Sequence, residues 1–196
     1  MTQVVLIRPG ATVYDDQNRV QGVLDLPLSD RGRAEIATLA ERLVGVELAA
    51  LYCGPSQSAL RTAEAVGKAL GLRPKRLDEL RNLDQGLWQG LCVEEIRRRH
   101  TKVFRQWQDD PFAIQPPQGE DIEHAVGRIV AALKPLVRRH RDDAFGLVAC
   151  EPIAQMISCH LRREGHVQVE DHVPTGGFER INVPPEWGRP PEANGT

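Results

Sequence analysis

A short apolar run, residues 4–7, is followed at once by the loop sequence Arg8-Pro9-Gly10-Ala11-Thr12. Four apolar residues that end at such a loop are typical of a buried strand in a parallel sheet. Open α/β sheets place their binding and catalytic residues at the carboxyl ends of the strands. The position of this Arg-X-Gly-X-Thr sequence therefore predicts a functional site directly after the first strand.

Segments typical of strands and of helices alternate along most of the chain. Ser29 is a suitable N-cap for a helix over 30–44, and Pro135 should end or kink a helix over 120–141. Residues 8–28 form a polar loop whose length is typical of functional loops. The alternation predicts a three-layer α/β/α sandwich with a mostly parallel central sheet. The other predicted helices are 55–70, 92–108 and 152–163, and the predicted strands are 4–7, 48–53, 74–77, 145–150, 167–170 and 178–183.

Length and composition fit a single globular domain. A chain of 196 residues is long enough for a real core, and its 41% hydrophobic content is ordinary for a globular protein. We expect the folded domain to span residues 1–183. The tail over 184–196 contains Pro, Gly, Glu and Asn, and we expect it to be disordered.

Charge, apolar runs and cysteines argue against several classes of protein. A formal net charge of −2 provides no basic stripe, so nucleic acid is not expected as a partner. No apolar run reaches about 18 residues, so no membrane-spanning segment is expected. The four cysteines form no Cys-X-X-Cys pair, which indicates reduced thiols in a cytoplasmic protein. They are Cys53, Cys92, Cys150 and Cys159.

Five short motifs, in order and at fitting intervals, resemble those of the histidine phosphatase superfamily, the phosphoglycerate-mutase-like proteins. The resemblance covers about residues 3–183 and implies a phosphoglycerate-mutase-like fold. In that family a histidine of the first motif takes up the phosphoryl group. The motifs here are Arg8-Pro9-Gly10-Ala11-Thr12, Gln21-Gly22 with Asp25-Leu26-Pro27-Leu28-Ser29 and Gly32, Leu51-Tyr52-Cys53-Gly54-Pro55 with Thr62-Ala63, Gly86-Leu87-Trp88-Gln89-Gly90, and Pro117-Gln118-Gly119-Glu120 with Arg128.

The catalytic positions of this chain depart from the family's pattern. Members of the family hold the phosphate with two arginines, two histidines and usually a carboxylic acid that protonates the leaving group. Arg8 matches the first arginine, but Pro9 stands at the place of the nucleophilic histidine. The second arginine falls on Ser58, the acid on Asn82 and the second histidine on Cys150. The motifs that build the scaffold are therefore kept, whereas four of five catalytic groups are replaced.

These replacements should abolish the family's reaction. A nucleophile must offer a lone pair, and proline at position 9 offers neither that nor a backbone N–H. Arg8 with Asp15 and Glu151 nearby would give the pocket a charge of zero or below, which repels phosphate. We therefore predict a pseudophosphatase that acts through its surface or its altered cleft as an interaction or regulatory protein.

Two other functions stay open. One is a binding module for neutral polar or zwitterionic ligands in the old cleft. The other is a phosphatase or phosphoglycerate-mutase-like hydrolase with catalysis rebuilt on Cys150 and Arg8. In it Cys150 would attack, and Arg61 could swing in to replace the missing arginine. The adjacent Glu151 argues against the rebuilt hydrolase, because its negative charge should raise the pKa of the Cys150 thiol. The candidate ligand-binding residues are Arg8, Thr12, Asp15, Ser58, Arg61, Asn82, Cys150 and Glu151.

The sequence names no specific partner. We expect an unknown protein partner or a small polar ligand, and a homodimer is compatible with the family resemblance. We expect no cofactor and no metal, because acidic loop residues such as Asp15, Asp16 and Glu151 are usually solvated.

Overall fold

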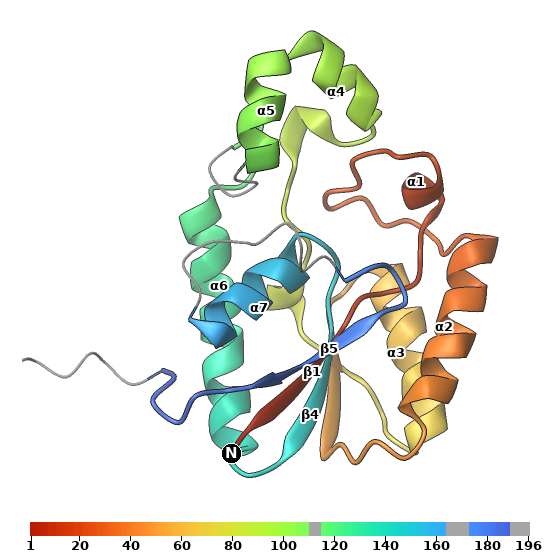
Figure 1. Ribbon diagram of the computed structural model, residues 1–196, viewed down its shortest axis with the longest axis vertical. Coiled ribbons are helices and arrows are strands. Elements are labelled where there is room, and N and C mark those ends of the chain that lie inside the picture. Colours follow the sequence, from red (N-terminus) through yellow and green to blue (C-terminus); the bar gives the residue numbers. More distant parts are fainter. Residues whose placement is uncertain (110–114, 164–172, 189–196) are drawn as a thin grey trace, which may run out of the picture.

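The computed structural model describes residues 1–109, 115–163 and 173–188. Within these ranges, five strands form one sheet in the order β3-β2-β4-β1-β5 (Figure 1). The pairs among β1 to β4 are parallel, and β5 runs antiparallel to β1 at one edge. The predicted α/β fold with a mostly parallel sheet is therefore confirmed. The strands are β1 (Gln3–Ile7), β2 (Ala50–Cys53), β3 (Lys75–Arg76), β4 (Ala144–Val148) and β5 (Phe178–Asn182).

The side chains of β1 show why helices cover both faces of the sheet. Val4 and Leu6 belong to a core cluster with residues of α6 and α7, and Val5 and Ile7 belong to a second cluster with residues of α2 and α3. All four side chains are fully buried, because successive residues of a strand point to opposite faces. The helices are α1 (Val13–Asp16), α2 (Asp30–Leu43), α3 (Gln57–Leu70), α4 (Val93–Arg99), α5 (Thr101–Asp109), α6 (Ile122–Arg139) and α7 (Ile153–Arg162), with single 3₁₀ turns at η1 (Asp78–Leu80) and η2 (Gly86–Trp88).

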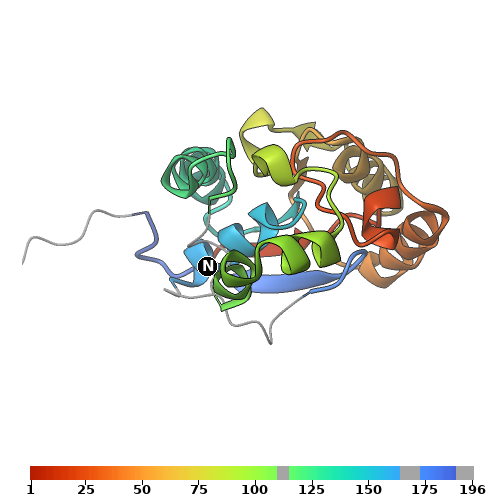
Figure 2. The same ribbon diagram turned by 90° about the horizontal axis from the view of Figure 1, so that it is seen from above.

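Two helices, α4 and α5, replace the single helix predicted over 92–108. The chain leaves helical geometry at His100, which has φ −131° and ψ 50°. The break lets Ile96 of α4 and Phe104 of α5 join Trp88 in a small core cluster separate from the two main ones. This helix pair lies beyond the carboxyl ends of the central strands (Figures 1 and 2).

Pro135 does not end α6, which continues to Arg139. Proline in a helix leaves the carbonyl four residues earlier without its partner. Pro135 is exposed, so water can reach that carbonyl, while the neighbouring Leu133 and Leu136 are buried in the core. The burial of these two leucines offsets the lost hydrogen bond. Within the described ranges no helix is long and apolar enough to cross a membrane.

Residues 184–188, which were expected to belong to a disordered tail, lie against the domain. Trp187 is 8% exposed, and its Nε1 donates a hydrogen bond to the His160 carbonyl at 3.1 Å. Its ring also meets the His160 ring edge-on. The folded domain therefore extends at least to residue 188, because burial of a large aromatic ring outweighs the local preference for disorder. The predicted strand over 167–170 and residues 189–196 lie outside the described residues.

Ser29 should contribute measurably to stability as the N-cap of α2. Its side chain accepts a hydrogen bond from the Gly32 backbone N–H at 3.1 Å, and the residue is 6% exposed. We expect Ser29→Ala to lower the free energy of unfolding by about 1 kcal/mol. Urea unfolding followed by circular dichroism would measure this. Thr38→Ala, at an exposed position of the same helix, serves as control and should change stability by less than about 0.5 kcal/mol; equal effects of both variants would contradict the capping role.

Candidate functional site

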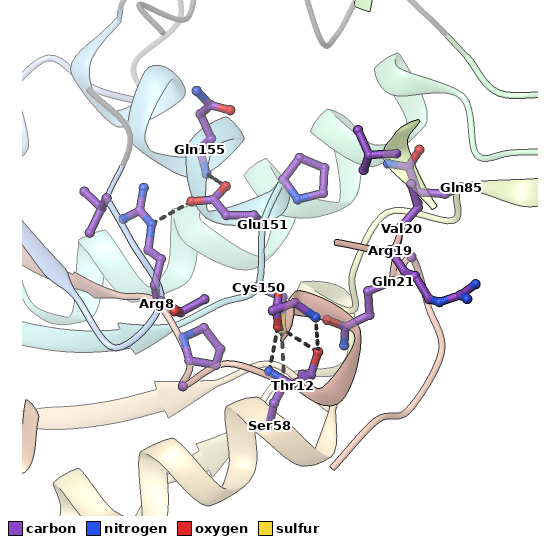
Figure 3. Close-up of a pocket in the computed structure, with 18 residues that line it drawn as sticks. Arg8, Thr12, Arg19, Val20, Gln21, Ser58, Gln85, Cys150, Glu151 and Gln155 are labelled. Atoms are coloured by element: carbon purple, nitrogen blue, oxygen red, sulfur yellow. Dashed lines mark hydrogen bonds and ion pairs between the residues drawn. The ribbon is translucent and has the colours of Figure 1, made fainter. Parts of the chain in front are cut away.

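A cavity of about 430 Å³ lies where β1 and β4 end (Figure 3). Its wall includes Pro9 and six of the eight ligand-binding residues predicted from the sequence. They come from the loops after β1 and β4 and from the first turn of α3, because the carboxyl ends of parallel strands share one edge of the sheet. The six residues are Arg8, Thr12, Asp15, Ser58, Cys150 and Glu151.

The other two predicted residues, Arg61 and Asn82, do not line this cavity. Arg61 is exposed and pairs with Glu64 one turn along α3, at 2.9 Å. Asn82 is buried, and its Nδ2 donates a hydrogen bond to the Gly22 carbonyl at 2.9 Å. Its amide therefore ties two loops together, and the Arg61 guanidinium does not replace a missing phosphate ligand.

Arg8 is buried and neutralised by two carboxylates. It is 3% exposed, its Nε lies 2.7 Å from Glu151 Oε1, and its Nη1 lies 2.6 Å from Glu179 Oε1. Charge-assisted contacts at these distances are among the strong hydrogen bonds of proteins. The two acids occupy Nε and Nη1 and neutralise the charge that would otherwise attract a bound anion.

Glu179 is held by a second arginine as well. Its other oxygen accepts hydrogen bonds from Arg162 at 2.7 Å and from the Ser158 hydroxyl at 3.1 Å. Burial alone would raise the pKa of the Glu179 carboxyl, but the hydrogen bonds and charges of Arg162 and Arg8 together lower that pKa below its ordinary value. Glu179 is therefore ionised at neutral pH and balances Arg8.

Asp15 caps a short helix and does not pair with Arg8. Its carboxylate accepts hydrogen bonds from the Thr12 backbone N–H at 2.6 Å and from the Thr12 hydroxyl at 2.7 Å. The Thr12 side chain in turn accepts from the Asp15 N–H, which completes a capping box at the start of α1. The spacing Thr-X-X-Asp in the sequence could have indicated this role. Residues 8–28 are thus not entirely loop.

The backbone of the loop after β1 has no free N–H for an anion. Pro9 has none, and the other four N–H groups of residues 8–12 all donate to protein acceptors. Anion-binding loops require backbone N–H groups that point at the ligand. The four hydrogen bonds run from Arg8 to the Gly177 carbonyl, from Gly10 to Thr62 Oγ1, from Ala11 to the Glu35 carboxylate and from Thr12 to the Asp15 carboxylate, at 2.6 to 3.1 Å.

Cys150 lies beside two serines at one end of the cavity. Its Sγ is 3.2 Å from Ser56 Oγ and 3.7 Å from Ser58 Oγ. Burial raises the pKa of the Cys150 thiol, and the hydroxyl hydrogen bonds of Ser56 and Ser58 only partly offset this. The thiol is therefore protonated at neutral pH, and a protonated thiol is a poor nucleophile.

Among the residues that sequence reasoning missed, Glu179 and Gln85 matter most for the chemistry of this site. Glu179 reaches Arg8 because β5 pairs with β1, with Glu179 opposite Leu6 in the register. Gln85 lines the cavity from the loop before η2 and is 7% exposed. No local pattern marks Glu179, whereas the position of Gln85 just before the Gly86 motif could have marked it as a candidate.

Because of Glu179, the free energy of unfolding should vary with pH in the acidic range. Its pKa is lower in the folded protein than in the unfolded chain, so its contribution is fully present above about pH 4.5 and is lost as the pH falls through the folded pKa. We expect Glu179→Gln to destabilise the protein by roughly 1–3 kcal/mol at pH 7. The difference in free energy of unfolding between Glu179→Gln and the wild type should shrink as the pH falls from about 5 to about 3.

Urea unfolding at several pH values would measure this effect. Glu41→Gln provides a matched control, because Glu41 is exposed on α2 and forms no ion pair within the described residues. The free energy of unfolding of Glu41→Gln should stay close to that of the wild type at every pH. If the difference in free energy of unfolding between Glu179→Gln and the wild type stays constant down to pH 3, the ionised Glu179 carboxylate does not stabilise the fold as we expect.

Comparison with known proteins gives several phosphatases as relatives. Phosphoserine phosphatase 1 of Hydrogenobacter thermophilus is 29% identical over 161 residues, which cover 82% of this chain and 76% of that protein. Glucosyl-3-phosphoglycerate phosphatase of Mycolicibacterium vanbaalenii is 31% identical over 71% of this chain and 62% of that protein. A bifunctional protein of Mycobacterium tuberculosis is 32% identical over 72% of this chain, but the chain spans only 36% of its length.

Solved structures and a family profile agree with these relatives. A mycobacterial glucosyl-3-phosphoglycerate phosphatase in complex with VO₃ has a TM-score of 0.83 at 23% identity, with 92% of this chain and 97% of that chain covered, which shows a shared fold. YhfR of Bacillus stearothermophilus has a TM-score of 0.77 at 26% identity, with 94% and 97% covered. The profile described as histidine phosphatase superfamily (branch 1) matches residues 4–177. The chain belongs to the histidine phosphatase superfamily.

Proposed function

We propose that this protein is a pseudophosphatase, which keeps the family's fold, has lost phosphoryl transfer and acts by binding through the remodelled cleft. The observation that carries this proposal is the pairing of Arg8 with Glu151 and Glu179 at 2.7 and 2.6 Å. A phosphate dianion would have to displace carboxylates that are already bound. Leaving a partly buried carboxylate without its partner costs about 3–5 kcal/mol.

The replacement of the family's nucleophilic histidine supports the same proposal. Pro9 stands on the cavity wall where the family's histidine is expected, and the Cys150 thiol is protonated. None of the histidines in the described ranges lines the cavity. These four are His100, His124, His140 and His160, whereas His166 and His172 fall outside those ranges.

The alternative of rebuilt catalysis has little support in the geometry. It would need a Cys150 thiolate, but burial raises the pKa of this thiol. Arg61 could have supplied a second cation at the phosphate, but it pairs with Glu64 on the exposed side of α3. Binding without turnover is therefore the better proposal.

The proposal extends to compartment and partners. We place the protein in the cytoplasm, because none of the four cysteines forms a disulfide, which suits a reducing compartment. The partner is a small polar ligand or a protein that recognises the cleft. A homodimer is compatible with this proposal, and size-exclusion chromatography with light scattering would test it.

The purified protein should not hydrolyse phosphate esters. With p-nitrophenyl phosphate as substrate, we expect release of p-nitrophenol at the rate of the uncatalysed control, because loss of a nucleophile costs about a million-fold in rate. Phosphoserine phosphatase 1 of Hydrogenobacter thermophilus, assayed in parallel, shows that the assay detects turnover. Activity that disappears in Cys150→Ser or Arg8→Ala would refute the proposal, and so would an acid-labile phosphoryl adduct on the protein.

Glu151→Gln should strengthen the binding of inorganic phosphate. The amide keeps the shape of the side chain but removes a negative charge that lies 2.7 Å from Arg8 Nε. We expect affinity to rise on the order of fivefold, since one screened charge near a protein surface is worth about 1 kcal/mol. Isothermal titration calorimetry would measure it. Glu64→Gln, outside the cavity, is the matched control, and unchanged phosphate affinity in Glu151→Gln would show that the Glu151 charge does not exclude anions.

A further inference from the structure

Two polar groups on buried residues of the cavity wall have no hydrogen-bond partner in the part of the chain that the structure describes. One is the side-chain amide of Gln85, a residue that is 7% exposed. The other is Nη2 of Arg8, whose Nε and Nη1 are both engaged. Figure 3 shows Gln85 across the cavity from Arg8 and Glu151.

Both residues line the cavity. Among the described residues, no side-chain nitrogen or oxygen is fully buried without a hydrogen-bond partner. The amide of Gln85 and Nη2 of Arg8 therefore each keep some exposed surface. Buried polar groups almost always have a partner, so these two are available to a molecule inside the cavity.

The backbone places Gln85 rigidly. Its carbonyl accepts a hydrogen bond from Trp88 N at 3.0 Å, and the next N–H, that of Gly86, donates to Asp84 Oδ1 at 2.8 Å. Gly86 has φ +49°, and a Cβ there would lie 2.2 Å from the Pro117 carbonyl oxygen. The loop therefore has little freedom to move, and a binding group on such a loop is positioned before the ligand arrives.

The charged residues on the cavity wall cancel one another. Arg8 and Arg19 are balanced by Asp15 and Glu151. Arg8 is also paired with Glu179, which is in turn paired with a second arginine. A volume of about 430 Å³ is typical of sites for small molecules. Because these charges balance, the cavity offers no net electrostatic attraction to a ligand with a large net charge.

We propose that the cavity binds a small polar molecule without net charge, with Gln85 as both hydrogen-bond donor and acceptor to it. Nη2 of Arg8 donates to an oxygen of the same ligand. Amino-acid zwitterions and sugars share this chemistry, and the experiment below separates them. This inference rests on the proposed function, because a phosphate ester held for hydrolysis would occupy the same space.

The test measures binding to the full chain by thermal shift and calorimetry. The probes are L-serine, L-glutamine, D-glucose, myo-inositol and inorganic phosphate, each up to 10 mM. We expect at least one uncharged or zwitterionic probe to raise Tm by about 3–6 °C at ten times its Kd. We expect inorganic phosphate to bind at least tenfold more weakly than that probe.

Gln85→Met distinguishes a binding role from a structural one. The substitution keeps the side-chain length and removes both hydrogen-bonding atoms, which have no partner among the described residues. We expect the Tm of the free protein to stay the same or rise, whereas the affinity for the bound probe falls at least tenfold. Gln57→Met is the matched control at an exposed position outside the cavity, and it should bind as the wild type does. Gln85→Ala is a second variant with the same expected loss of binding.

Three results would overturn this inference: no uncharged probe binds at 10 mM, phosphate binds more tightly than all of them, or Gln85→Met leaves the affinity unchanged. The proposed function fails by a different result, the hydrolysis of a phosphate ester. A protein that neither turns over the ester nor binds an uncharged probe would keep the proposed function and lose only this ligand class.

Discussion

The buried guanidinium of Arg8 is the constraint on which the cavity depends. A charge that is 3% exposed is tolerated only when it is paired, because desolvation of an unpaired ion costs several kcal/mol. In a phosphatase of this family, the resemblance implies that substrate phosphate meets this arginine. Here the protein supplies its own counter-ions, Glu151 and Glu179, and Arg162 extends the network. The charge of Arg8 is balanced without a ligand, although its Nη2 has no hydrogen-bond partner among the described residues, so the presence of Arg8 is not by itself a sign of phosphate binding.

Sheet topology explains both what sequence reasoning found here and what it missed. Glu151 follows β4, which the motif resemblance already placed beside the site, so its proximity to Arg8 was predicted. Glu179 lies 171 residues from Arg8 along the chain and reaches it only because β5 adds to the sheet beside β1. The apolar pattern of a segment indicates that it forms a strand of the sheet, but it does not indicate which other strand lies beside it. Contacts that depend on strand order were therefore out of reach of the sequence.

Elements set by local chemistry were predicted well, and single side-chain partners were not. The strand over residues 4–7 and the N-cap at Ser29 follow from short-range patterns, and both are present. Asp15 lines the cavity, but its carboxylate also caps α1, a role that the spacing Thr-X-X-Asp could have indicated. Trp187 packs on α7 although its neighbours in the sequence resemble a tail. The packing of Trp187 depends on tertiary distances that composition does not contain.

Stability alone does not account for the ion network beside an open cavity. Replacing a buried ion pair by apolar side chains of similar size is often neutral or stabilising. A protein that had only to fill the space left by lost histidines could have closed it with Leu or Val. Instead, the wall keeps Arg8 fixed by two acids across a space of about 430 Å³ from Gln85, whose amide has no partner in the part of the chain that the structure describes. The charges of this wall are fixed and sum to zero, and the amide of Gln85 is neutral and held rigidly. Such an arrangement suits the recognition of a dipolar molecule better than the stabilisation of a fold.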